Sequence, residues 1–246
     1  MKKEELIKDL NPLFFKGCAH RGLHTKEFTE NGRKAFQNAL DHNRAIELDV
    51  HLTKDNQLIV VHDSDLKRVT GKEGIVENRT IQEIKDNYRL LDGEQLPTFQ
   101  EVLSLVKEKV PMLVELKTYQ GNNGPLARRA REELSKIKDK RNFRIIAFDP
   151  RALIRRKKTK IHTSLLIAKQ REDVFFFRHF FDSVDIEWVR LKEKKVRNYQ
   201  KKHLLNSWTI NSEDKLEISL HYADRITFQE LPAELIRAKI EEKNKM

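Results

Sequence analysis

Cysteine is almost absent from this chain, and its scarcity excludes two kinds of site. Cys18 is the only cysteine among 246 residues, so the chain can form neither an intrachain disulfide nor a metal site built of thiolates. We expect Cys18 to be a small buried hydrophobic residue in a reducing compartment, which makes the cytoplasm the expected location.

Long apolar runs are also missing. No stretch approaches the ~20 consecutive apolar residues that a membrane-spanning helix needs. The N-terminal segment Met1–Leu10 lacks the uninterrupted apolar run of a secretory signal. Charged residues make up 35% of the chain and hydrophobic residues 38%. This balance argues against a polytopic membrane protein, yet it supplies enough apolar side chain for a sizeable core, which a disordered chain would lack.

Linkers rich in glycine, proline or serine are absent, as are internal repeats and low-complexity segments. We therefore interpret residues 1–246 as one domain. The length suits this interpretation, because α/β barrels commonly form a single domain of roughly 250 residues.

The charge is strongly of one sign: 49 Lys and Arg stand against 38 Asp and Glu, a formal net charge of +11. The cations gather in three runs, Arg128–Arg131, Arg151–Lys160 and Arg190–Lys202. Such a surface could attract nucleic acid, anionic lipid or a small anionic substrate, or could simply be solvated. Because no nucleic-acid-binding motif accompanies the charge, we do not expect a nucleic-acid partner.

Short aliphatic runs alternate with longer segments of helical period, a pattern typical of βαβ units and a parallel sheet. Phe99–Lys107 is one such helical segment, and Thr98 and Glu101 form a capping box at its start; Thr80 and Glu83 form another. The nine predicted strands are Gly17–His20, Ala45–Val50, Leu58–His62, Met112–Leu116, Arg144–Asp149, His162–Ile167, Val184–Trp188, Leu204–Ile210 and Arg225–Phe228.

Nine strands are one more than a TIM (β/α)8 barrel contains. The link from Val50 to Leu58 is too short for a crossover, which takes about a dozen residues or more, but it suits a hairpin. We therefore predict that Leu58–His62 returns antiparallel to the second strand, outside the barrel. The remaining eight strands predict an α/β fold of the TIM barrel type, with residues 63–97 as a small insertion before the third barrel strand.

Ionisable residues are concentrated where these strands end. Because side chains alternate along a strand, Glu47 and Asp49 share one face, as do Glu115 and Lys117 of the next barrel strand. Paired charges between apolar neighbours suit the C-terminal rim of a barrel, where active sites lie, better than they suit a core. The full set comprises His20, Arg21, Glu47, Asp49, His62, Asp63, Glu115 and Lys117.

The residue types in this set predict a chemistry. Three carboxylates in one pocket repel one another unless a cation neutralises them, and ligands that offer only oxygen suit Mg²⁺ or Ca²⁺. The arginine and the lysine are typical partners of phosphoryl oxygens. The two histidines can accept and donate protons near neutral pH. Together they predict cleavage of a phosphodiester.

Each feature taken singly also has a structural explanation. A Glu-x-Asp pair can face solvent on a half-exposed sheet, and a histidine such as His51 can be only a hydrogen-bonded structural residue. We interpret Asn31 as the cap of a helix that begins near Gly32, and Asp63 as a residue that orients His62 or closes a turn.

A series of short motifs follows in chain order: His20-Arg21-Gly22, Glu30-Asn31, Ile46-Glu47-Leu48-Asp49-Val50, Leu52-Thr53-Lys54-Asp55, Val61-His62-Asp63, Thr70-Gly71, Leu96-Pro97-Thr98 and Glu115-Leu116-Lys117. In this order they closely resemble the glycerophosphodiester phosphodiesterase family. The resemblance is dense from Cys18 to Lys117 and then thins to Phe148-Asp149-Pro150 and Trp208-Thr209-Ile210-Asn211.

The resemblance implies a TIM barrel that hydrolyses glycerophosphodiesters to sn-glycerol 3-phosphate and an alcohol such as choline, ethanolamine or glycerol. It also implies a role for each matching position. The implied acid/base pair is His20 and His62, the ligands of Mg²⁺ or Ca²⁺ are Glu47, Asp49 and Glu115, the phosphate-binding residues are Arg21 and Lys117, and Trp208 lines the substrate pocket. In related phosphodiesterases the glycerol 2-hydroxyl can attack first and give a cyclic phosphate.

The chain departs from the family pattern at several points. Thr29 replaces a common proline, and the last strand is followed by Gln229 where the family commonly has aspartate. Lys169–Lys202 is basic and carries five phenylalanines, which we interpret as helix packing in the core, with a membrane-facing or partner-facing patch as the alternative. Two other functions stay open: a lysophospholipase-D-like enzyme acting on lipids, and a non-catalytic basic barrel that binds nucleic acid or anionic lipid.

Overall fold

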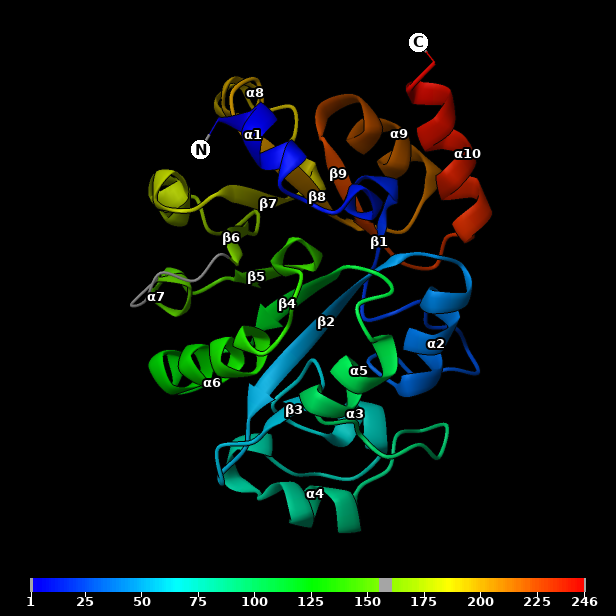
Figure 1. Ribbon diagram of the computed structural model, residues 1–246, viewed down its shortest axis with the longest axis vertical. Coiled ribbons are helices and arrows are strands. Elements are labelled where there is room, and N and C mark those ends of the chain that lie inside the picture. Colours follow the sequence, from blue (N-terminus) through cyan, green and yellow to red (C-terminus); the bar gives the residue numbers. More distant parts are fainter. Residues whose placement is uncertain (1, 155–160, 246) are drawn as a thin grey trace.

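The computed structural model describes residues 2–154 and 161–245, and eight parallel strands among them form a closed barrel (Figure 1). The barrel strands are β1 (Cys18–Ala19), β2 (Ala45–Leu52), β4 (Met112–Leu116), β5 (Phe143–Ala147), β6 (His162–Ile167), β7 (Ser183–Glu187), β8 (Leu204–Ile210) and β9 (Arg225–Phe228). The short β1 closes the barrel, because it pairs with both β2 and β9. The predicted TIM barrel is confirmed, and every predicted strand forms with ends that differ by at most two residues.

The surplus strand is the predicted hairpin return. β3 (Leu58–Val60) runs antiparallel to β2, with Val50 opposite Val60 and Leu52 opposite Leu58. The turn between them includes Asn56 in the left-handed region, at φ 58°, a conformation that asparagine tolerates better than most residues. The hairpin places β3 outside the barrel, and His62 follows two residues after β3 ends.

Helices follow most barrel strands and form the outer layer in Figure 1. The α-helices are α1 (Lys3–Lys8), α2 (Arg33–Asp41), α3 (Lys67–Thr70), α4 (Ile81–Asn87), α5 (Phe99–Val106), α6 (Asn123–Ser135), α7 (Pro150–Leu153), α8 (Lys194–Gln200), α9 (Glu213–Tyr222) and α10 (Ala233–Lys243). The 3-10 segments are η1 (Pro12–Lys16), η2 (Val76–Asn78), η3 (Lys140–Asn142), η4 (Asp173–Phe180) and η5 (Trp188–Arg190). Both predicted capping boxes are present, at Thr80 before α4 and at Thr98 before α5.

The segment between β3 and α5 packs on the outer side of the hairpin. It contains α3, η2 and α4, which lie at the lower end of the molecule in Figure 1, away from both termini. Its apolar side chains, which include Leu66, Val76, Ile84 and Leu96, form a cluster with Ile59 of β3, and this cluster is separate from the main core. This cluster fixes the segment that follows His62, close to the open end of the barrel.

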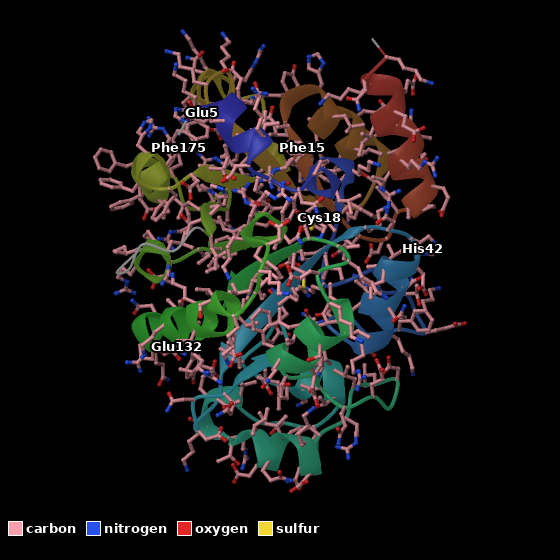
Figure 2. The ribbon with its side chains drawn as sticks, in the orientation of Figure 1. Glu5, Phe15, Cys18, His42, Glu132 and Phe175 are labelled. Atoms are coloured by element: carbon pink, nitrogen blue, oxygen red, sulfur yellow. The ribbon has the colours of Figure 1, made fainter. Side chains whose placement is uncertain are left out.

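Two expectations about side chains have different outcomes. Cys18 is free and buried, as predicted. The five phenylalanines do not all pack in the core: Phe175 is buried, but Phe176, Phe177 and Phe180 are exposed. Figure 2 shows Phe175 at the edge of the molecule opposite His42. Three consecutive residues point in different directions around any helix, so one buried face cannot receive all of these rings.

Part of the basic run Arg151–Lys160, residues 155–160, lies outside the described residues. None of the helices formed by residues 2–154 and 161–245 has the length and apolar character that crossing a bilayer requires.

Candidate active site

Three acidic side chains converge inside one end of the barrel. Glu47 and Asp49 stand two positions apart on β2 and therefore point to the same side. Glu115 on β4 is paired in register with Asp49. One oxygen of each carboxylate lies within 4.8 Å of the others, and all three residues are buried. The alternation along β2 and β4 thus assembles the acidic cluster that the sequence predicts.

Hydrogen bonds orient two of these carboxylates. Glu47 Oε2 accepts from the backbone N–H of Arg21 at 2.9 Å, and Asp49 Oδ2 accepts from Asn31 Nδ2 at 2.9 Å. The second oxygens, Glu47 Oε1 and Asp49 Oδ1, are buried and have no hydrogen-bond partner among the described residues, although Asp49 Oδ1 lies 3.5 Å from Lys117 Nζ. A buried carboxylate oxygen without a donor is costly unless a cation binds it. The all-oxygen cluster therefore fits a hard divalent cation.

The electrostatics of the three carboxylates support the same conclusion. Burial raises the pKa of Glu47 well above its ordinary value, and repulsion from Asp49 and Glu115 raises it further. Burial likewise raises the pKa of Glu115. Burial would raise the pKa of Asp49 too, but the nearby cations, Lys117 first among them, hold that pKa below its ordinary value. Full ionisation of the cluster therefore requires an additional positive charge.

Two histidines flank the cluster, one after β1 and one after β3. His20 Nε2 lies 3.9 Å from Glu47 Oε2, and His20 Nδ1 lies 2.5 Å from Gln229 Oε1. His62 Nδ1 lies 2.6 Å from Asp63 Oδ1, so Asp63 orients the ring, one of its two predicted roles. Burial lowers the pKa of His20 from 6.5 to about 4, helped by the charge of Arg21, and burial also lowers the pKa of His62. The ring of His20 is therefore neutral near pH 7, whereas the carboxylate of Asp63 acts against burial and favours the charged form of His62.

Two cations complete the set. Lys117 Nζ lies 2.8 Å from Glu115 Oε1 and 3.0 Å from His62 Nε2. Burial would lower the pKa of Lys117, but the carboxylates of Glu115 and Asp49 outweigh this effect and raise that pKa above its ordinary value. Arg21 Nε lies 3.6 Å from Asp49 Oδ2. Lys117 thus remains charged, and both side chains lie beside the acidic cluster.

A cavity of about 120 Å³ opens between these groups. Six of the eight residues to which the family resemblance gives a role line it: His20, Arg21, Glu47, His62, Glu115 and Trp208. The other two, Asp49 and Lys117, contact the lining through the pairs described above. Trp208 Nε1 donates to the backbone oxygen of Asp185 at 2.9 Å, and the Trp208 ring meets Phe148 edge-on at 5.5 Å. These contacts fix the indole as one wall.

Asn31 has a different place from the one its sequence context predicts. Gly32, not Asn31, is the N-cap residue of α2. Asn31 is buried with φ 58°, and its side chain bonds Asp49 instead of a helix end. The interpretation as a helix cap is wrong, because Asn31 Nδ2 is needed by a buried carboxylate that lies 18 residues further along the chain.

An ion-pair chain that sequence reasoning missed connects the site to the segment after β3. Glu30 accepts from Arg21 Nη1 at 2.7 Å and from Arg68 Nη2 at 2.7 Å. Arg68 Nε donates to Asp63 Oδ2 at 2.5 Å. Arg68 of α3 therefore donates hydrogen bonds to Glu30, the partner of Arg21, and to Asp63, the partner of His62. Two members of this ion-pair network had a signal in the sequence, since Asp63 belongs to the ionisable set at the strand ends and Glu30 to the family motifs.

His51 of β2 supports the backbone of His62. Its Nε2 lies 3.0 Å from the backbone oxygen of His62, and its Nδ1 lies 2.6 Å from Glu77 Oε1. His51 is therefore a hydrogen-bonded structural residue, as predicted.

The chain is similar in sequence to known proteins. The model of the glycerophosphoryl diester phosphodiesterase family matches residues 20–217. YhdW of Bacillus subtilis is 29% identical over 214 residues, which is 79% of this chain and 86% of YhdW. A glycerophosphodiester phosphodiesterase of Caldanaerobacter subterraneus is 41% identical over 102 residues, which is 37% of this chain and 40% of that enzyme.

Solved structures show the same fold. A glycerophosphodiester phosphodiesterase from Parabacteroides distasonis superimposes with a TM-score of 0.75 at 26% identity, over 92% of this chain and 97% of that one. A phosphodiesterase from Oleispira antarctica, crystallised with its product sn-glycerol-3-phosphate, gives a TM-score of 0.77 at 19% identity, over 93% and 96% of the two chains.

Proposed function

The chain belongs to the glycerophosphoryl diester phosphodiesterase family and is a phosphoric diester hydrolase, and we propose that it converts glycerophosphodiesters to sn-glycerol 3-phosphate and an alcohol. One observation carries the proposal: three buried carboxylates within 4.8 Å of one another adjoin a cavity that two histidines and an arginine also line. The proposal places the reaction in the cytoplasm, in keeping with the free thiol of Cys18.

Glu47, Asp49 and Glu115 would hold a divalent cation. The buried Glu47 Oε1, which has no hydrogen-bond donor, and the repulsion within the cluster support this role. When bound, Mg²⁺ or Ca²⁺ would withdraw charge from the phosphoryl oxygens of the substrate. Both ions accept oxygen ligands, so we propose a hard divalent cation and leave the choice between the two to the assay.

His20 and His62 would transfer the protons. The amide behind His20 is neutral and leaves Nε2 with a free lone pair, which suits the residue that accepts a proton from the attacking hydroxyl or water. The carboxylate of Asp63 behind His62 stabilises an imidazolium, which suits the residue that protonates the leaving alkoxide. Water and the glycerol 2-hydroxyl are both nucleophiles that His20 could deprotonate.

Arg21 and Lys117 would bind the phosphate. Each carries a charge next to the acidic cluster, where an anionic phosphodiester would replace part of their contact with Asp49 and Glu115. The indole of Trp208 would pack against the organic part of the substrate, since it forms a fixed wall of the same cavity.

The test is direct. Purified protein is incubated with glycerophosphocholine, glycerophosphoethanolamine or glycerophosphoglycerol in the presence of Mg²⁺ or Ca²⁺, and release of sn-glycerol 3-phosphate is measured. His20→Ala and His62→Ala should each lower kcat by roughly 10²–10⁴-fold while the circular dichroism spectrum stays unchanged. Full activity in both variants, or full activity after chelation of divalent cations, would refute the assignment.

Lysophospholipids are a second candidate substrate class, and one observation favours them. Phe148 lines both the catalytic cavity and a much larger groove on the outside of the barrel. Rat lysophospholipase D GDPD1 is 31% identical over 133 residues, which is 49% of this chain and 41% of that enzyme. Turnover of lysophosphatidylcholine at a rate comparable to that of glycerophosphocholine would establish this second activity.

A further inference from the structure

Three phenylalanines of η4 are exposed on the outside of the barrel. Phe176, Phe177 and Phe180 have 73%, 42% and 74% of their surface exposed. The rings lie together, because the centroids of Phe176 and Phe177 are 5.7 Å apart and those of Phe177 and Phe180 are 6.3 Å apart. Single exposed apolar residues are ordinary, whereas a contiguous group indicates a binding surface.

The segment that carries these rings is firmly anchored. Val174 and Phe175 are buried, and Phe175 packs edge-on against Tyr199 of α8 at 6.1 Å. Side chains that follow one another in a 3-10 helix point about 120° apart. The inward packing of Phe175 therefore leaves its neighbour Phe176 facing outward, on a rigid base.

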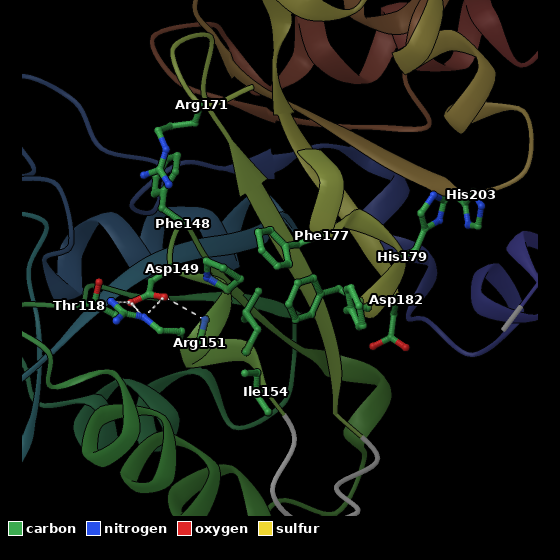
Figure 3. Close-up of a pocket in the computed structure, with 14 residues that line it drawn as sticks. Thr118, Phe148, Asp149, Arg151, Ile154, Arg171, Phe177, His179, Asp182 and His203 are labelled. Carbon is green, nitrogen blue, oxygen red and sulfur yellow. Dashed lines mark hydrogen bonds and ion pairs between the residues drawn. The ribbon is translucent and has the colours of Figure 1, made fainter. Parts of the chain in front are cut away.

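A groove of about 1020 Å³, lined by both apolar and charged side chains, lies between this segment and α7 (Figure 3). Phe177, Phe180 and Phe181 line it from η4, and Leu153 lines it from α7. Phe148, which follows β5, lines both this groove and the catalytic cavity. The groove therefore adjoins the candidate active site through Phe148.

Cations lie next to η4, beside the buried ring of Phe175 and not over the exposed rings. The guanidinium of Arg178 lies 4.5 Å from the ring centre of Phe175, and Lys195 Nζ lies 5.7 Å from it. Between Lys169 and Lys202 the chain has ten Lys and Arg against six Asp and Glu, a difference of +4. Further exposed cations on and beside α8 are Lys192, Lys194, Arg197, Lys201 and Lys202.

We propose that this aromatic–basic surface, formed by Phe176, Phe177 and Phe180 with the cations of α8, docks the protein on an anionic phospholipid bilayer. Aromatic rings bind at the level of the lipid headgroups, and Lys and Arg around them are attracted to anionic lipid. The three rings and the cations of α8 are already exposed, and Lys195 would exchange its ion pair with Glu172 for a lipid headgroup. The inference goes beyond the proposed function and does not depend on it.

Charge distinguishes the bilayer from the other occupants. A second copy of the chain would bring an equally basic face against this one, and like charges oppose such a contact. Nucleic acid would satisfy the cations but would leave three adjacent rings without an apolar partner unless single-stranded bases stacked on them. An anionic bilayer offers negative headgroups and acyl chains together.

Co-sedimentation with vesicles tests the proposal. Wild-type protein is mixed with vesicles of phosphatidylcholine alone or of phosphatidylcholine with phosphatidylglycerol, at low and high NaCl. We expect binding to the anionic vesicles that weakens with salt, and a loss of roughly tenfold or more in the partition coefficient for the double variant Phe176→Ser/Phe180→Ser. Leu91→Ser is the matched control, because Leu91 is 69% exposed but lies in the segment between β3 and α5.

Each alternative has its own signature. Equal vesicle binding by the double variant and the wild type would show adsorption by charge alone and would overturn the role of the rings. A wild-type dimer that the double variant converts to monomer, without vesicle binding, would assign the surface to a second copy. Binding to single-stranded DNA instead of vesicles would also overturn the proposal. Turnover of glycerophosphocholine is measured in parallel, so that a failure of the proposed function is recognised separately.

Discussion

His20 Nδ1 lies 2.5 Å from the amide oxygen of Gln229, the residue that follows β9. An amide oxygen only accepts hydrogen bonds, so Nδ1 carries a proton and Nε2 keeps its lone pair. In His62 the equivalent nitrogen faces the carboxylate of Asp63 at 2.6 Å. In both rings Nδ1 donates a hydrogen bond. The acceptor is a neutral amide for His20 and a carboxylate for His62.

Replacing Gln229 with Glu should shift the acid limb of the pH–rate profile toward neutrality. A carboxylate behind Nδ1 stabilises the imidazolium and should raise the pKa of His20, now about 4, by about one unit or more. Because a protonated His20 cannot accept a proton, kcat/KM should fall at acidic pH and change little at about pH 8.

The measurement is kcat/KM for glycerophosphocholine from acidic to alkaline pH. Asn211→Asp is the control, since it adds the same charge at an exposed position after β8. An acid limb that stays at its wild-type position in Gln229→Glu would remove His20 from the role of base.

Divalent cations should stabilise the fold through the acidic cluster. A ligand that binds only the folded state adds about 2.7 kcal/mol at a concentration of 100 Kd, and about 1 kcal/mol shifts the Tm of a chain of this size by roughly 2–4 °C. Mg²⁺ or Ca²⁺ should therefore raise the Tm of the wild type by several degrees. In Glu47→Gln this rise should be mostly lost, while the Tm without added cation stays the same or increases because a repulsive charge is removed.

Calorimetry with and without each cation measures this effect. Glu132→Gln, at an exposed position on α6, should retain the full rise in Tm. An equal rise in Glu47→Gln and in the wild type would place the cation elsewhere on the molecule.

Arg68 should act on catalysis without touching the substrate cavity. It donates to Asp63 and Glu30, which in turn bond His62 and Arg21. Arg68→Met should lower kcat for glycerophosphocholine about tenfold while the cation-induced rise in Tm persists, because the acidic cluster is intact. Arg68→Lys should restore activity only in part, since an ammonium cannot reproduce the fork of hydrogen bonds.

The neighbouring residue provides the matched control for Arg68. Lys67 is also an exposed cation of α3, but it pairs with Glu73. Lys67→Met should leave kcat unchanged. If Arg68→Met and Lys67→Met reduce kcat equally, the effect belongs to the surface charge of α3 and not to the orientation of His62.

The acidic cluster could be predicted from sequence because it follows from a local rule. Alternation along a strand places Glu47 beside Asp49, and parallel pairing brings Glu115 opposite. Gln229 and Arg68 follow no such rule, since Gln229 meets His20 across 209 positions and Arg68 meets Glu30 across 38. Contacts of this kind depend on how the barrel closes and where α3 packs, which a local pattern does not specify.

The phenylalanines show a different limit. Apolar composition predicted burial for the Phe-rich segment, but burial requires a partner element as well as apolar side chains. The chain forms a 3-10 segment over Asp173–Phe180, and only Val174 and Phe175 are buried against the barrel and α8. The exposure of Phe176, Phe177 and Phe180 depends on packing geometry, which cannot be predicted from composition alone.

Glu30 should make the stability of the fold depend on pH in one direction. Burial would raise the pKa of Glu30, but hydrogen bonds and charges from Arg68 and Arg21 outweigh it and hold that pKa below its ordinary value. A carboxyl group with a lowered pKa in the folded state stabilises the fold above its unfolded pKa of about 4.3, and this contribution is lost as the pH falls through the folded pKa. Glu30→Gln should therefore reduce the free energy of unfolding by about 1–2 kcal/mol at neutral pH, and by progressively less at acidic pH. Urea unfolding at both pH values measures the difference, with the exposed Glu27→Gln as the control. A loss in Glu30→Gln that is the same at acidic and neutral pH would show that the ionised carboxylate of Glu30 does not carry the stabilisation.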